Sequence, residues 1–141
     1  GLEVSVYLDA SVLVSMFVID PLSARAAAVL ARVRDTLIVS DLGGAEFVSA
    51  LSRRVRMKLL TAREARTAVA NFDAWLATTP QYTLMTPQDI VACDAYLRRF
   101  DLPLRAPDGF HIAITSRMGA SMLSFDKQLT VAAKKLGLPV V

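Results

Sequence analysis

With 141 residues, the chain is long enough for one domain with a sizeable hydrophobic core, and we expect a single domain over residues 1–141. Apolar residues make up 54% of the sequence, yet no apolar run approaches the ~20 residues that a membrane span needs. We therefore expect no membrane association, and we assign the apolar excess to a deep core and a buried subunit interface. The net charge of +3 is mild and does not by itself indicate a nucleic-acid partner.

Short apolar runs alternate with longer helical stretches along the chain. We expect helices over residues 10–19, 22–34, 42–58, from Thr61 to about 77, from Thr86-Pro87 to about 100, and over 108–118 and 127–136. Residues 101–107 read as a loop with two prolines. We expect strands over residues 4–8, 36–40, 81–85, 120–124 and 138–141. Alternation of this kind predicts an α/β sandwich around a mainly parallel sheet, with both faces covered.

The compartment can be inferred from two further features. Cys93 is the only cysteine, so it cannot form an internal disulfide. The N-terminal residues lack the pattern of a secretory signal peptide. Both features favour a cytoplasmic protein.

Four acidic residues fall near the predicted carboxyl ends of strands, where sites form in parallel sheets. Asp9 and Asp126 follow strands, Glu46 lies early in the helix after the second strand, and Asp108 opens a later helix. Each acid has a structural alternative: a helix cap for Asp9 or Asp108, and a turn for Asp126. Glu46 is harder to explain in this way, because an unpaired acid in the apolar stretch AEFVSAL would be costly.

Four carboxylates at one edge would repel each other unless a cation offsets their charge. Their hard oxygen ligands favour Mg²⁺ or Mn²⁺ over zinc. Such an ion can activate a water molecule and stabilise charge on a phosphate, so the chemistry that suits the cluster is phosphodiester hydrolysis.

Other polar residues near the predicted edge have alternative roles. Ser11 and Ser124 could hold a metal-bound water or a phosphate oxygen, although a helix-start serine is an equal alternative for Ser11. For His111, the single histidine, we favour a structural or supporting role over catalysis. Asp94 is a reserve candidate for the site, and Asp41 is expected to cap the helix over 42–58.

Basic residues form two groups. The first is the run SRRVRMK, with Arg53, Arg54, Arg56 and Lys58; the second comprises Arg98, Arg99 and Arg105. A solvated helix face explains each group as well as a binding surface does.

Four segments together carry a family resemblance. They are YLDAS at 7–11, AEFVSAL at 45–51, LRAPDGFHIAI at 104–114 and LSFD at 123–126. In order, spacing and total length the sequence resembles a PIN-domain ribonuclease, specifically a VapC-like toxin of a type II toxin–antitoxin system. The resemblance implies a three-layer α/β/α sandwich in which the catalytic, metal-binding acids are Asp9, Glu46, Asp108 and Asp126, assisted by Ser11 and Ser124.

The resemblance also implies partners. It suggests a Mg²⁺- or Mn²⁺-dependent endoribonuclease that cuts RNA with a metal-activated water, forms a homodimer and binds a small antitoxin protein. Our hypothesis for the antitoxin site is an apolar groove among the first four helices, near Val29 and Met57. The chain departs from the family's usual residues at Gly109, often alanine, and at Lys127, often arginine.

Two alternatives belong to other functional classes. The first is a non-catalytic PIN-like scaffold that binds RNA or protein, although such a scaffold need not retain a self-repelling acid cluster. The second is an aspartate-nucleophile phosphatase, which needs a D-x-D motif at the first strand. Here that segment reads D-A-S, which argues against a phosphatase.

Overall fold

The computed structural model describes residues 4–141, and within them the chain forms four strands and seven helices. The strands are β1 (Ser5–Leu8), β2 (Thr36–Ser40), β3 (Gln81–Thr83) and β4 (Ser121–Leu123). All neighbouring strands are parallel, in the order β3-β2-β1-β4. The helices are α1 (Ala10–Phe17), α2 (Ser23–Arg32), α3 (Asp41–Arg56), α4 (Ala62–Leu76), α5 (Pro87–Leu97), α6 (Ala106–Arg117) and α7 (Lys127–Lys135). The predicted α/β class and parallel sheet are thus confirmed.

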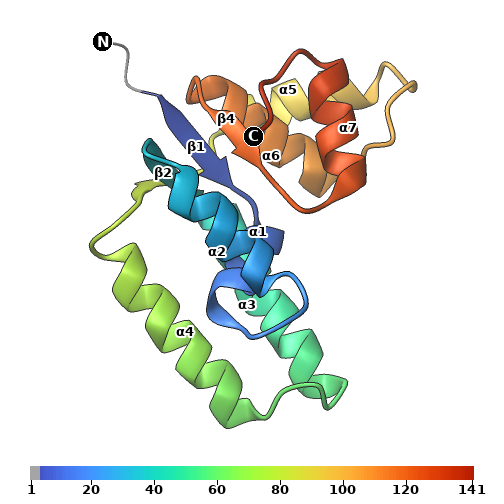
Figure 1. Ribbon diagram of the computed structural model, residues 1–141. Coiled ribbons are helices and arrows are strands. Elements are labelled where there is room, and N and C mark those ends of the chain that lie inside the picture. The colour runs from blue at the N-terminus through green and yellow to red at the C-terminus, as the bar shows by residue number, and fades with distance from the viewer. Residues whose placement is uncertain (1–3) are drawn as a thin grey trace.

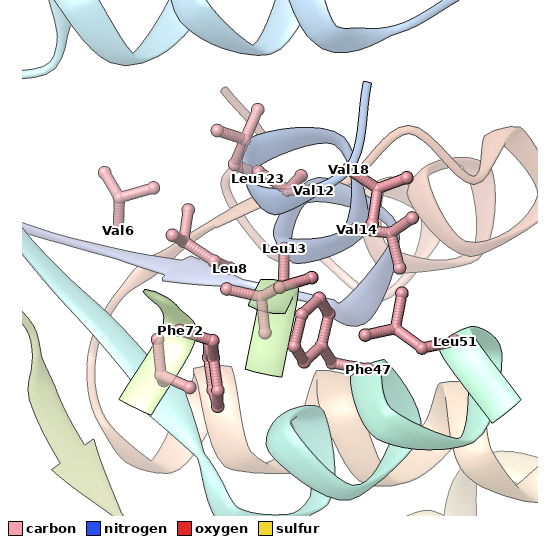
Figure 2. Packing of buried hydrophobic residues seen from close by; sticks show 12 residues of the cluster. Val6, Leu8, Val12, Leu13, Val14, Val18, Phe47, Leu51, Phe72 and Leu123 are labelled. Atoms are coloured by element: carbon pink, nitrogen blue, oxygen red, sulfur yellow. The ribbon is translucent and has the colours of Figure 1, made fainter. Parts of the chain in front are cut away.

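The sheet is covered on both faces, which makes the fold a three-layer sandwich (Figure 1). Because side chains alternate along a strand, Val6 and Leu8 of β1 pack into one apolar cluster while Tyr7 packs into the other. The first cluster joins the sheet to α1 and α3, where Phe47 and Leu51 of α3 meet α1 (Figure 2). The second cluster joins the sheet to α6 and α7.

Helices α3 and α4 form an antiparallel pair that extends beyond the sheet (Figure 1). The capping box predicted at the start of α4 is present: Thr61 accepts from Glu64 N at 3.1 Å, and Glu64 accepts from Thr61 N at 3.0 Å. Phe72 of α4 packs against Phe47 of α3, with 4.7 Å between ring centroids. Aromatic packing therefore joins the α3–α4 pair to the hydrophobic core.

Several predicted boundaries are wrong by a few residues. Helix α6 begins at Ala106 and not at 108, because Pro107 fits the first turn, where no backbone N–H donor is required. Residues 138–141 do not form a strand: only Val140 bridges to Met122, and Pro139 lacks the N–H that would extend a ladder.

Gly109 has a packing reason in this chain. A Cβ at this position would lie 2.4 Å from the Sγ of Cys93 on α5, so an alanine could not fit without movement. The close approach of Cys93 therefore favours glycine at this position. At the other end of α6, Arg117 makes a bidentate ion pair with buried Asp89 of α5, at 2.9 and 3.0 Å.

The helices within residues 4–141 are all too short or too polar to cross a bilayer.

Candidate active site

Asp9 is the most buried acid at the carboxyl edge of the sheet. It follows β1 directly and caps α1, accepting from Val12 N at 3.3 Å. The hydroxyls of Ser11 and Ser124 both donate to it, each at 2.6 Å and each to a different carboxylate oxygen. Burial raises the pKa of Asp9, and the two serine hydrogen bonds oppose that rise. Asp9 is thus a helix cap and also the centre of a polar network.

The same network reaches Asp126. Asp126 caps α7 by accepting from Leu129 N at 3.2 Å, and its own N–H donates to Ser124 Oγ at 3.0 Å. Ser11 Oγ accepts from Phe125 N at 2.9 Å, which ties the turn after β4 to the start of α1. Within the described chain, therefore, Ser11 and Ser124 use their protons to hold Asp9 and their oxygens to hold the turn that carries Asp126.

Asp108 approaches this group from the first turn of α6. Its carboxylate accepts from Arg105 N at 3.3 Å. Burial raises the pKa of Asp108, and the negative charge of Asp126 raises it further. The Arg105 guanidinium lies 3.9 Å away, but its side chain is 81% exposed and therefore well screened by water.

Glu46 lies on α3 and has a different environment. Its carboxylate receives a hydrogen bond from His111 Nε2, and its side chain remains 36% exposed. The other ring nitrogen of His111, Nδ1, lies 2.6 Å from the Tyr7 hydroxyl, which in turn lies 2.7 Å from Ser40 Oγ. Ser40 Oγ accepts from Gly43 N at 2.9 Å and caps α3.

The Glu46 carboxylate can only accept, so His111 Nε2 is the donor in their hydrogen bond. The Tyr7 hydroxyl hydrogen-bonds both to Nδ1 of the same ring and to Ser40 Oγ. Burial raises the pKa of Tyr7 above its ordinary value, which keeps this phenol protonated. Glu46 is therefore oriented by a buried chain that runs from α3 through His111 and Tyr7 to Ser40, the residue that caps α3.

Sequence reasoning placed His111 in a supporting role but missed Tyr7 and Ser40. The available signal was a tyrosine and a serine near the carboxyl ends of two mainly aliphatic strands that would pair in the sheet. Two other assignments differ in the structure. Ser40, not Asp41, is the cap of α3, and Asp41 accepts from Met85 N at 2.8 Å. Asp94 is exposed and pairs with Arg98 at 2.6 Å, so it faces away from the acids.

The donor set at this edge fits a hard divalent cation in its chemistry. Asp9, Asp108 and Asp126 offer oxygens, and among residues 4–141 no basic side chain forms an ion pair with Asp9 or Asp126. The link between these acids is pairwise, as between Asp9 and Asp126 through Ser124. In the described chain, no three His, Cys, Asp or Glu side chains converge closely enough to enclose an ion.

The fold and the site together define an α/β protein with a carboxylate-lined edge on a parallel sheet. The family model described as PIN domain matches residues 6–135, and the chain belongs to this family. No curated protein sequence matches the chain.

Solved structures share the fold at low sequence identity. Mycobacterium tuberculosis VapC20, described as a Sarcin-Ricin loop cleaving toxin, has a TM-score of 0.75 and 19% identity, covering 96% of this chain and 98% of its own. VapBC2 from Rickettsia felis, bound to a promoter DNA fragment, has a TM-score of 0.70 and 12% identity, covering 97% of each chain. FitAcB from Neisseria gonorrhoeae has a TM-score of 0.68 and 14% identity, covering 96% and 95%.

Proposed function

We propose that this protein is a divalent-metal-dependent endoribonuclease and the toxin of a toxin–antitoxin pair. The observation that carries the proposal is that Asp9 and Asp126, which follow β1 and β4, are linked through Ser124, while Asp108 lies close enough to Asp126 for that negative charge to raise its pKa. Membership of the PIN domain family and the likeness to a toxin described as cleaving the Sarcin-Ricin loop support it.

In this proposal Asp9, Asp108 and Asp126 hold Mg²⁺ or Mn²⁺, with Glu46 completing the acidic site. A bound divalent ion supplies an activated water and stabilises negative charge on the phosphate. The protein's own part is to fix the carboxylates. Ser11 and Ser124 hold both oxygens of Asp9, and helix N-termini hold Asp108 and Asp126.

Glu46 needs separate support, because it lies on a helix surface with freedom to rotate. We assign His111 and Tyr7 as positioning residues that hold the Glu46 carboxylate through Nε2 of the imidazole. Partners of this kind, one layer behind the ligands, typically change metal affinity by about 10- to 100-fold.

The proposed partners follow from the same likenesses. Two of the similar structures, VapBC2 and FitAcB, are toxin–antitoxin assemblies, which supports a small antitoxin partner here. An apolar groove between α3 and α4, lined by Leu51, Val55, Ala65 and Val69, suits a partner helix. Of the two positions expected from the sequence to border such a groove, Val29 packs against the core and Met57 lines a different groove. A homodimer in the cytoplasm remains part of the proposal.

The test is cleavage of a mixed RNA pool by purified, partner-free protein. We expect cutting with Mg²⁺ or Mn²⁺, none with a chelator, and none with D9N. Folded protein that binds RNA or an antitoxin but cuts nothing under any of these conditions would favour the non-catalytic scaffold instead.

A further inference from the structure

A second groove opens beside Glu46 along α3, next to the groove between α3 and α4, and Arg56 lines both. It has a volume of about 470 Å³, and its lining includes Glu46, Ser49, Arg53, Arg54, Arg56 and Met57. Arg53 lies two helical turns beyond Glu46, about 10 Å along the axis at 1.5 Å per residue. The groove thus leads from the acidic site into the first basic run of the sequence.

Two of these arginines have unneutralised charge. Arg54 pairs with Asp20 at 3.4 Å. Arg53 and Arg56 are exposed, and among residues 4–141 neither has a carboxylate within ion-pair distance; Arg56 donates only to Ser52 Oγ, at 2.7 Å. The groove therefore carries a local positive charge close to a negative one.

The second basic group behaves differently. Arg98 pairs with Asp94 at 2.6 Å, Arg99 pairs with Asp101 at 3.0 Å, and Arg105 lies 3.9 Å from Asp108. Each arginine of the second group therefore has an acidic neighbour at the surface. The two groups were equivalent in the sequence, and in the structure only the first lines a groove with arginines that lack an acidic partner among residues 4–141.

The helix dipole does not account for the groove as a whole. Arginines in the last turn of α3 complement the helix dipole, but that does not explain a hollow that connects them to Glu46. A polyanion satisfies the charge and the shape together.

We propose that this groove binds the sugar–phosphate backbone of single-stranded RNA, with Arg53 and Arg56 contacting phosphates next to the bond held at the acidic site. The inference rests on the proposed nuclease function, since the groove begins at Glu46, one of the acids proposed to act on the RNA. Phosphate contacts of this kind position the strand without reading its sequence.

The test is binding of a short fluorescein-labelled single-stranded RNA, followed by anisotropy at several salt concentrations in EDTA. The R53Q/R56Q variant is compared with R98Q/R99Q, which removes the same net charge. Loss of two phosphate contacts should flatten the plot of log affinity against log salt by about 1.4, at roughly 0.7 per contact on a single strand. The control pair should keep the wild-type slope, and melting temperatures check that both variants fold.

The outcomes separate this inference from the nuclease proposal. An equal loss in both variants would mean that only net charge matters and would overturn the inference. Wild-type binding by R53Q/R56Q would also overturn it and leave the groove to a protein partner. If R53Q/R56Q alone loses binding but wild-type protein with Mg²⁺ or Mn²⁺ leaves the RNA intact, RNA binding in the groove is supported and the nuclease proposal fails.

Discussion

The two sides of the acidic edge are built differently. On the side of β1 and β4, Asp9, Asp108 and Asp126 are held by serine hydroxyls and helix N-termini. On the side of α3, Glu46 is held by a histidine that is itself locked by Tyr7. The first side fixes carboxylate oxygens without supplying a full positive charge, whereas the second supplies an imidazole N–H at a half-exposed position.

This difference has an energetic meaning. Carboxylates held only by neutral donors, with burial raising the pKa of both Asp9 and Asp108, destabilise the folded protein when they ionise. A divalent cation would relieve that cost. Glu46 already has a hydrogen-bond partner, His111. Loss of that support should therefore change the geometry of the site more than its charge balance. Four predictions test this division.

The largest effect is expected from the β1 and β4 side. D9N or D126N should reduce RNA cleavage on the order of a thousandfold, because losing several kcal/mol of metal-assisted stabilisation corresponds to such a factor. Cleavage kinetics at saturating Mg²⁺ measure the effect. D94N is the matched control, since Asp94 is exposed and paired with Arg98 away from the site. Activity of D9N within tenfold of wild type would contradict the assignment.

Divalent cations should stabilise the fold through the same three acids. At Mg²⁺ concentrations of one hundred times Kd, linkage predicts about 2.7 kcal/mol of added stability. Thermal unfolding with Mg²⁺ and with EDTA measures it. The D108N variant should lose most of this gain and D94N should keep it. Equal Mg²⁺ stabilisation of wild type and D108N would show that the ion binds elsewhere.

Breaking the α3 side should have a smaller effect. Y7F removes the hydroxyl that hydrogen-bonds to His111 Nδ1 while conserving volume in the core. We expect Mn²⁺ affinity to fall about tenfold, as for other partners behind metal ligands. Titration calorimetry measures this directly, and it would not respond to a loss of stability alone. Y96F is the control, because Tyr96 lies on α5 away from the acids. Unchanged Mn²⁺ affinity in folded Y7F would remove Tyr7 from the positioning role.

The smallest effect concerns pH in the absence of metal. Because the pKa of Asp108 is raised, mainly by burial, the folded protein binds this proton more tightly than the unfolded chain does. Its contribution to stability is therefore present at low pH and is lost as pH rises from about 3.9, the ordinary value, through the raised pKa. The melting temperature of D108N minus that of wild type, both in EDTA, should be more positive at pH 7 than at pH 4. A difference that shrinks with rising pH would contradict the raised pKa.

Local patterns were sufficient for most of the fold. The strand over 36–40 was predicted at its observed bounds, and the capping box at Thr61 and Glu64 marked a helix start, because both depend on neighbouring residues. The predicted strand at 138–141 failed, since it pairs only around Met122 and Pro139 has no N–H with which to extend the ladder. Helix α6 began earlier than expected because a proline tolerated in a first turn was read as part of a loop.

The sequence by itself determined the alternating architecture and the family, and it predicted the four acids of the site. Their periodicity and motif spacing are properties of the chain. Only the tertiary structure decided how those acids are supported and which basic group remains open. Tyr7 and His111 are 104 residues apart, and Arg54 and Asp20 are 34 apart. No local pattern encodes such pairs, because they exist only once the parallel strands and the helices have packed.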